Sequence, residues 1–289
     1  MEDPDKLLRA VLDFASRQPG IDAVVQTGSR ARGLRVDEWS DLDIELIGPG
    51  AVGLAGSDTW QEEIAPTLLS VHLANEGEDE PDWPTCLVVF AEGRKVDFTL
   101  AGPERLEAMK RDGLDDLYGR GYVVHLDRTG VTEGLSPSHP APPAWTAPGS
   151  REFEENQREF WFEATQVPVY AARGDLWPAA SRLAEMRELL LTMLEWYAGA
   201  RSGGRTDTWY GGHHLAEWLG DDYRDRIPDT FARYDAADIV RALRATAGLY
   251  ADAAAATGRF LSLPVLDLRD RVLGHVDGIS RGVTSSECP

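Results

Sequence analysis

The sequence predicts an α+β fold, with a mixed β-sheet and flanking helices in residues 1–135 and an α-helical bundle in residues 151–289. Apolar or alternating runs of about four to eight residues, separated by turn residues, indicate strands in the first part. Beyond residue 150 the apolar residues recur with a period of about 3.6, which is typical of packed helices. Residues 136–150 are rich in proline, which continues neither a helix nor a sheet, so we interpret them as a linker.

Each element of the first part is predicted from its own pattern. Apolar residues at helical spacing predict a helix over residues 5–17, which would pack on the sheet. The apolar run within residues 21–26 predicts a buried strand, and residues 40–47 alternate between polar and apolar as in a strand with one buried face. The other expected elements are short helices at 59–64 and 103–110, a β-hairpin that joins 86–90 to 96–100, and a last strand at 122–126.

The second part reads as helices throughout, and a chain of 289 residues is long enough for two modest domains. Pro168 lies inside the first predicted helix, so we expect a kink or a break at that point. The expected helices cover residues 151–172, 177–200, 213–219, 236–257 and 266–275.

Two aspartates on the predicted strand 40–47 indicate a metal site. Because side chains alternate along a strand, Asp41, Asp43 and Glu45 share one face. Neighbouring carboxylates repel unless a cation lies between them, and Mg²⁺ accepts several carboxylate oxygens while it keeps positions for water and phosphate oxygens. The alternative is an exposed sheet face with solvated acids.

A Gly-Ser turn upstream of this strand favours the metal site, because it suits the phosphates of a nucleoside triphosphate. Gly28 lets the backbone approach a ligand closely, and Ser29 offers a hydroxyl and a backbone N–H to a phosphate oxygen. Arg30 follows directly and adds positive charge in an acidic chain. A Gly-Ser turn is often only a turn, and the arginine can equally be solvated, so the joint spacing with the aspartates carries this interpretation.

A third carboxylate is expected on the second strand of the predicted hairpin. Residues 96–100 alternate so that Asp97 lies on the face opposite Val96, Phe98 and Leu100. Asp97 would complete a set of metal ligands if this strand lay beside the strand of Asp41 and Asp43. An acid on a polar sheet face is the plain alternative.

At this point the sequence resembles the aminoglycoside 6-adenylyltransferases, also called streptomycin adenylyltransferases, of the polymerase-β-like nucleotidyltransferase superfamily. The resemblance rests on Gly28-Ser29-Arg30, on residues 37–44 and on residues 96–100. It continues into the second part, where residues 159–162 and 187–196 are similar to helical segments of that family.

The resemblance implies an enzyme with a nucleotidyltransferase sheet and a helical substrate-binding domain. Such an enzyme would move AMP from ATP to a hydroxyl of an aminoglycoside such as streptomycin, release pyrophosphate, and inactivate the antibiotic. Asp41, Asp43 and Asp97 would be the catalytic Mg²⁺ ligands, and Gly28, Ser29 and Arg30 would grip the β- and γ-phosphates. Asp97 is the first candidate for a general base, and Glu159 is the second.

Three glutamates of the helical part are candidate ligands for a cationic acceptor. Glu159 and Glu163 are four residues apart and so share one helix face, beside aromatic neighbours that suit ammonium or guanidinium groups. Glu195 follows an apolar helical stretch and is a third candidate. The alternative for all three is a solvated helix face, and we expect Trp161 and Trp196 to be core residues.

The charge balance excludes one class of partner and favours another. The chain has 49 acidic and 29 basic residues, a net charge of −20, which disfavours nucleic acid because its binding proteins depend on Lys and Arg. An acidic cleft suits a small cationic acceptor, although a strongly acidic surface also occurs in salt-adapted or merely soluble proteins. We interpret the acidic stretch 76–82 as a solvated loop rather than a binding site.

Further composition favours a cytoplasmic protein, and we expect it to be a monomer. The two cysteines, Cys86 and Cys288, give no disulfide framework and fit a reducing compartment, and no apolar run is long enough for a membrane span. Two rival functions remain open: the same chemistry on another small acceptor, such as a lincosamide or a metabolite, and a degenerate non-enzyme that only binds a nucleotide.

Overall fold

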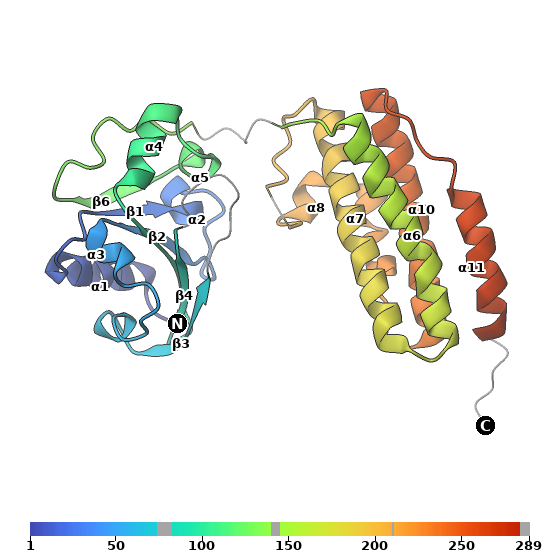
Figure 1. Cartoon of the computed structure of the whole chain (residues 1–289), viewed down its shortest axis with the longest axis horizontal. Coiled ribbons are helices and arrows are strands. Elements are labelled where there is room, and N and C mark those ends of the chain that lie inside the picture. The colour runs from blue at the N-terminus through green and yellow to red at the C-terminus, as the bar shows by residue number, and fades with distance from the viewer. Residues whose placement is uncertain (74–82, 140–144, 210, 284–289) are drawn as a thin grey trace. The chain divides into compact units, whose positions relative to one another are not determined.

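The structure, a computed structural model, describes residues 1–73, 83–139, 145–209 and 211–283 (Figure 1). The chain divides into two compact units, Met1–Pro143 and Ala144–Pro289. This division falls within the proline-rich segment 136–150, of which residues 140–144 lie outside the described residues. The acidic stretch 76–82 and Cys288 also lie outside them, so these two interpretations remain predictions.

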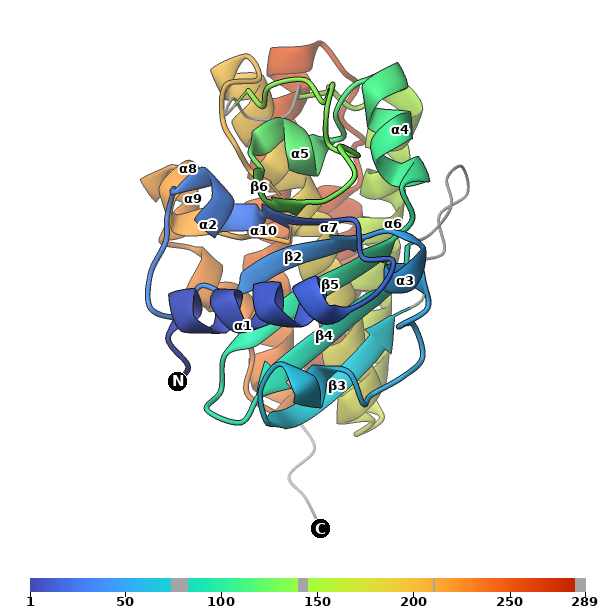
Figure 2. The same cartoon turned by 90° about the vertical axis from the view of Figure 1, so that its left-hand side faces the viewer.

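In the described part of the first unit, six strands form one mixed sheet in the order β3-β4-β5-β2-β1-β6 (Figure 2). The pairing of β2 with β5 is parallel, and the other neighbouring strands are antiparallel. The predicted hairpin is confirmed as β4 and β5. The strands are β1 (Ala23–Thr27), β2 (Leu42–Ile47), β3 (Thr67–Leu73), β4 (Thr85–Phe90), β5 (Lys95–Ala101) and β6 (Val123–Asp127).

One face of the sheet is covered by the predicted first helix, α1 (Pro4–Arg17), which crosses the strands in Figure 2. Asp3 caps this helix, because its side chain accepts a hydrogen bond from the backbone N–H of Lys6. Val11 and Phe14 of α1 are fully buried against the apolar face of the sheet, and other apolar residues of this helix are partly buried there. The helical spacing of the apolar residues therefore correctly predicts which face of α1 packs on the sheet.

Two helices cover part of the opposite face. They are α4 (Glu104–Asp112) and α5 (Asp116–Arg120), and their apolar residues pack on Ile47 and Ala101 at the ends of β2 and β5. The start of each of these two strands carries the polar residues that the alternation predicts. Because α4 and α5 pack on the ends of β2 and β5, they leave the candidate carboxylates at the starts of these strands uncovered.

The second unit is helical. Its helices α6, α7 and α10 pack against one another, and α11 packs on α6 (Figure 1). The core includes a stacked pair, Phe160 of α6 and Tyr250 of α10, whose ring centroids lie 3.5 Å apart. The prediction of Trp161 and Trp196 as core residues is confirmed, since both pack in this cluster. The long helices are α6 (Ser150–Ala172), α7 (Leu176–Ser202), α10 (Ala236–Leu261) and α11 (Arg269–Val283).

Several elements differ from the sequence predictions. Helix α6 continues through Pro168, which is buried, so no break occurs there. Two further helices differ at their bounds: α8 covers only Leu215–Trp218, and α11 lies further along the chain than predicted. Strand β3 was not predicted, because an exposed edge strand lacks a buried face. None of the described helices has the length and apolar character needed to cross a membrane.

Candidate active site

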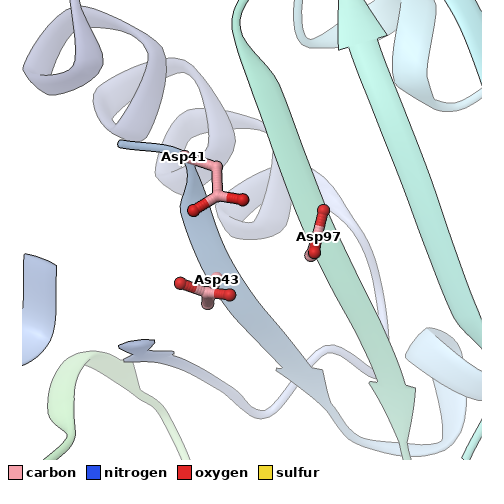
Figure 3. A group of neighbouring side chains, drawn as sticks. All are labelled: Asp41, Asp43 and Asp97. Carbon is pink, nitrogen blue, oxygen red and sulfur yellow. The ribbon is translucent and has the colours of Figure 1, made fainter. Parts of the chain in front are cut away.

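The three predicted aspartates meet on the uncovered end of the sheet face (Figure 3). Asp43 lies in β2 and Asp97 in β5, and the two residues are direct partners in the parallel register. Asp41 immediately precedes β2. One carboxylate oxygen from each residue lies within 4.8 Å of the other two, so the three side chains form a cluster open to a shared ligand.

The donor set of this cluster fits a hard divalent cation. All three ligands are carboxylates, which Mg²⁺ prefers. Asp97 Oδ1 is buried and accepts no hydrogen bond from the described residues, so one ligand atom is unsatisfied without a cation. Burial raises the pKa of Asp97, and burial together with the charges of Asp41 and Asp97 raises the pKa of Asp43 to about 6. A bound cation would offset the repulsion among the three carboxylates.

Lys95 partly neutralises the cluster. Its Nζ lies 2.9 Å from Asp41 Oδ2 and 3.0 Å from Asp97 Oδ2, so the ammonium bridges the two carboxylates. Burial opposes the charged form of Lys95, but the hydrogen bonds to Asp41 and Asp97 outweigh it and raise the pKa of the amine. The ammonium is therefore charged at neutral pH.

Gly28 gives the Asp43 carboxylate its space. This glycine begins the short helix α2 (Gly28–Arg32) with a φ of +70°, in the left-handed region that side chains rarely adopt. A Cβ atom at this position would lie 1.8 Å from Asp43 Oδ2. Ser29 follows, half-buried, and its hydroxyl has no partner among the described residues. The predicted Gly-Ser turn therefore lies directly against the predicted metal ligand.

Arg30 is held by the loop that leads into β2. Its Nε donates to the carbonyl oxygens of Ser40 and Asp41, each at 3.1 Å, and its Nη2 donates to the carbonyl of Asp37. Arg94, which is buried, donates from Nη1 to the same Ser40 carbonyl at 2.7 Å. These bonds fix the backbone at Asp41, so we assign Arg30 to positioning that residue. Its predicted contact with phosphates stays a prediction.

Sequence reasoning missed Arg94, because no pattern marks an arginine in a hairpin turn as buried. The N-terminus holds it: the Glu2 carbonyl accepts from Arg94 Nε at 2.8 Å, and the Glu2 carboxylate accepts from the Arg94 backbone N–H. Glu2 and Ser40 are far apart in the sequence, so this link exists only in the folded chain.

Glu45 shares the strand face of the aspartates but belongs to a separate network. Its carboxylate is 2% exposed and pairs with Arg105, whose Nε and Nη2 donate to Oε2 and Oε1 at 2.8 Å each. The Tyr118 hydroxyl also donates to Oε2, at 2.8 Å. Glu45 is therefore satisfied inside the protein and is not a candidate ligand.

The raised pKa of Asp43 predicts that Asp43→Asn stabilises the metal-free protein. The folded-state pKa is about 6, above that of the unfolded chain, so wild-type stability is full in acid and falls as the pH rises to about 6. Asparagine removes this loss, and above pH 6 the free energy of unfolding should exceed the wild-type value by about 1–3 kcal/mol. Urea denaturation with a chelator at several pH values measures it. An equal difference at pH 4 and pH 8 would contradict the prediction.

Two of the three predicted acceptor ligands line one groove between α6 and α7. The groove has a volume of about 680 Å³, and its lining includes Glu159, Glu163 and the exposed ring of Phe162 from α6 and Glu185 from α7. Two arginines also line it, Arg158 and Arg182, and these pair with Glu154 and Glu163. Glu195 is not among its lining residues; it lies six residues, about 9 Å along the axis of α7, beyond Leu189, which does line the groove. The structure thus brings Glu159 and Glu163 together and separates them from Glu195.

The paired and unpaired oxygens of these glutamates differ. Glu163 Oε1 accepts from Arg182 Nη1 at 2.7 Å, while its buried Oε2 has no partner among the described residues. Glu195 Oε1 is likewise buried without a partner there, and burial raises the pKa of that carboxyl. Glu159 and Glu185 form no ion pair with a described residue, so the groove has acidic groups that remain available to a cation.

A mixed sheet that gathers three carboxylates beside a glycine turn, followed by a helical unit, defines this protein as a nucleotidyltransferase. The chain belongs to the streptomycin adenylyltransferase family, whose sequence model matches residues 1–276. A curated relative, the aminoglycoside 6-adenylyltransferase of Bacillus subtilis (strain 168), is 26% identical over 212 residues, which cover 70% of this chain and 72% of the relative.

A solved structure was also matched, the crystal structure of an aminoglycoside 6-adenyltransferase from Bacillus subtilis. It aligns with 97% of this chain and 99% of its own length, at 19% sequence identity and a TM-score of 0.47. The match of the family model over residues 1–276 confirms the resemblance seen in the sequence at the level of the family.

Proposed function

We propose that this enzyme transfers AMP from ATP to a hydroxyl of streptomycin or a related aminoglycoside, depends on Mg²⁺, and releases pyrophosphate. The observation that carries the proposal is the convergence of Asp41, Asp43 and Asp97 beside Gly28. The family supplies the reaction class, and the carboxylates supply the site at which it can occur.

The site residues of the sheet unit have different roles in this reaction. Asp41, Asp43 and Asp97 would hold the divalent cation, which when bound offsets charge on the attacked phosphate and lowers the pKa of the acceptor hydroxyl. The backbone at Gly28 approaches the phosphates, and the Ser29 hydroxyl donates to a phosphate oxygen. Arg30 keeps Asp41 in place through the loop carbonyls.

Asp97 is our candidate for the general base. Burial raises its pKa, which brings its basicity nearer to neutral pH. Glu159, the second candidate, belongs to the helical unit and lines the groove described above. We assign Glu159 to acceptor binding instead.

The groove of the helical unit suits a polycationic acceptor. Glu159 and Glu185 offer carboxylates without a described partner, and Glu163 offers one unpaired oxygen. The exposed ring of Phe162, with 56% of its surface accessible, can lie against a guanidinium or ammonium group. Charge-assisted hydrogen bonds to these carboxylates would give orientation as well as affinity.

Glu159→Gln tests this groove. The substitution removes one carboxylate, so we expect the KM for streptomycin to rise about tenfold, the effect of ~1.4 kcal/mol, while the KM for ATP stays unchanged. Glu155→Gln is the matched control, because Glu155 lies on the same helix, pairs with exposed Arg151 and is outside the groove. An unchanged KM for streptomycin in the Glu159 variant would remove this residue from the acceptor site.

Pyrophosphate release tests the function itself. The purified enzyme is assayed with each nucleoside triphosphate, Mg²⁺ and a panel of aminoglycosides and lincosamides, and mass spectrometry identifies the product. We expect release only with streptomycin-like acceptors and ATP, and a product heavier by one adenylyl group. Turnover with a lincosamide alone would replace the acceptor in the proposal, and no turnover with any acceptor would favour a nucleotide-binding non-enzyme.

A further inference from the structure

Lys95 bridges two of the three carboxylates, those of Asp41 and Asp97, although no function described above uses it. It begins β5 and sits across from Asp41, because the adjacent residues Leu42 and Val96 are partners in the parallel register. Its ammonium donates to Asp97 and pairs with Asp41 at 3.0 Å and 2.9 Å. The side chain is 43% exposed, so it reaches the cluster from solvent and is free to leave it.

The ammonium and a divalent cation compete for the same oxygens. A Mg²⁺ ion needs carboxylate oxygens at about 2.1 Å and an ordered octahedral shell. Asp41 Oδ2 and Asp97 Oδ2 are already bonded to Nζ, and two cations a few ångströms apart repel strongly in a partly buried site. Metal binding therefore requires Lys95 to give up both ion pairs.

A nucleoside triphosphate offers the released ammonium a new partner. Lysine is a flexible point charge on a long stem, and phosphate oxygens are acceptors that it binds well. The displaced side chain stays beside the site, because β5 fixes its backbone next to Asp97. The triphosphate brings negative charge to this position together with the metal.

We propose that Lys95 is a resident counter-ion that holds the metal site closed until a nucleotide arrives, and that it then binds the triphosphate. Metal and nucleotide therefore bind with positive coupling, each making the site more favourable for the other. The inference rests on the proposed function, since it assumes that the three aspartates hold a divalent cation for a nucleotide. It adds one residue, Lys95, which couples metal binding to nucleotide binding.

The test measures the affinity of the protein for Mn²⁺ without nucleotide, and then its affinity for a non-hydrolysable ATP analogue at saturating Mn²⁺. For Lys95→Met, we expect the Kd for Mn²⁺ without nucleotide, measured by electron paramagnetic resonance, to fall about tenfold, which corresponds to ~1.4 kcal/mol. For the same variant, the Kd for the analogue at saturating Mn²⁺ should rise severalfold. The two Kd values should change in opposite directions. A merely structural defect would instead weaken the binding of both ligands.

Two variants keep the test decisive. Lys95→Arg retains the charge, so both affinities should stay near wild type, and Lys110→Met removes an ammonium that pairs with Glu107 on α4, outside the cluster. If Lys95→Met fails to fold by circular dichroism, Lys95→Gln replaces it with a polar side chain of similar length. Unchanged or weaker Mn²⁺ binding in the folded variant would overturn the role of Lys95. If wild type binds no Mn²⁺ even with the analogue, the metal site of the proposed function fails as well.

Discussion

Asparagine in place of Asp41, Asp43 or Asp97, one at a time, is expected to lower kcat for pyrophosphate release by a thousandfold or more, a loss of about 4 kcal/mol of transition-state stabilisation. Each substitution removes one of the negative charges that gather within 4.8 Å of one another, while it keeps the side-chain volume. The measurement is steady-state pyrophosphate release with ATP, Mg²⁺ and streptomycin.

A matched control separates the site from general charge effects. Glu107→Gln removes an acid from the exposed surface of α4 in the same unit and should keep wild-type kcat. Circular dichroism and urea denaturation show whether each variant is folded. Wild-type turnover in all three folded aspartate variants would place the chemistry elsewhere.

The second large effect is expected from Gly28→Ala. The new Cβ would lie 1.8 Å from Asp43 Oδ2 and 2.5 Å from Asp43 Cγ, so the carboxylate must move away from its partners. We expect kcat to fall at least a hundredfold, an effect of about 3 kcal/mol, because a ligand displaced by about an ångström no longer supports the transition state. Steady-state kinetics under the same conditions measures it.

Gly33→Ala is the control for this substitution. Gly33 also has a positive φ, +60°, but a Cβ there would meet no atom within 4 Å. Both variants carry the conformational penalty of a side chain in the left-handed region, about 1 kcal/mol. Only the Gly28 variant also collides with Asp43. An equal loss of activity in the two variants would mean that backbone strain, and not the contact with Asp43, explains the effect.

Much of the fold could be predicted because its signals are local. The alternation in residues 40–47 and 96–100 places the apolar residues in the core and the aspartates on the other face. The helical spacing of the second part predicts three of its long helices, α6, α7 and α10, within a few residues. Strand β3 escaped prediction because its apolar residues are exposed on an edge strand, where burial imposes no pattern.

The residues of the candidate site could be predicted from the sequence, but the contacts that these residues make in the folded chain could not. Sequence spacing singled out Gly28, Ser29 and the aspartates, since glycine turns and acid pairs are rare in this combination. It assigned Arg30 to phosphates, which stays a prediction, and it gave no sign that this guanidinium also donates to the loop carbonyls before β2. It also grouped Glu195 with Glu159 and Glu163, of which only Glu159 and Glu163 line the described groove, so the role of Glu195 stays a prediction.

By itself, the sequence determined which faces of which strands are polar, where the helices run and which family this protein belongs to, because these depend on neighbours in the chain. Only the tertiary structure decided that Asp43 lies opposite Asp97, that Glu45 is neutralised by Arg105, and that Lys95 pairs with Asp41. These contacts join segments about fifty residues apart. Their register is set by the packing of the whole sheet, which no local pattern encodes.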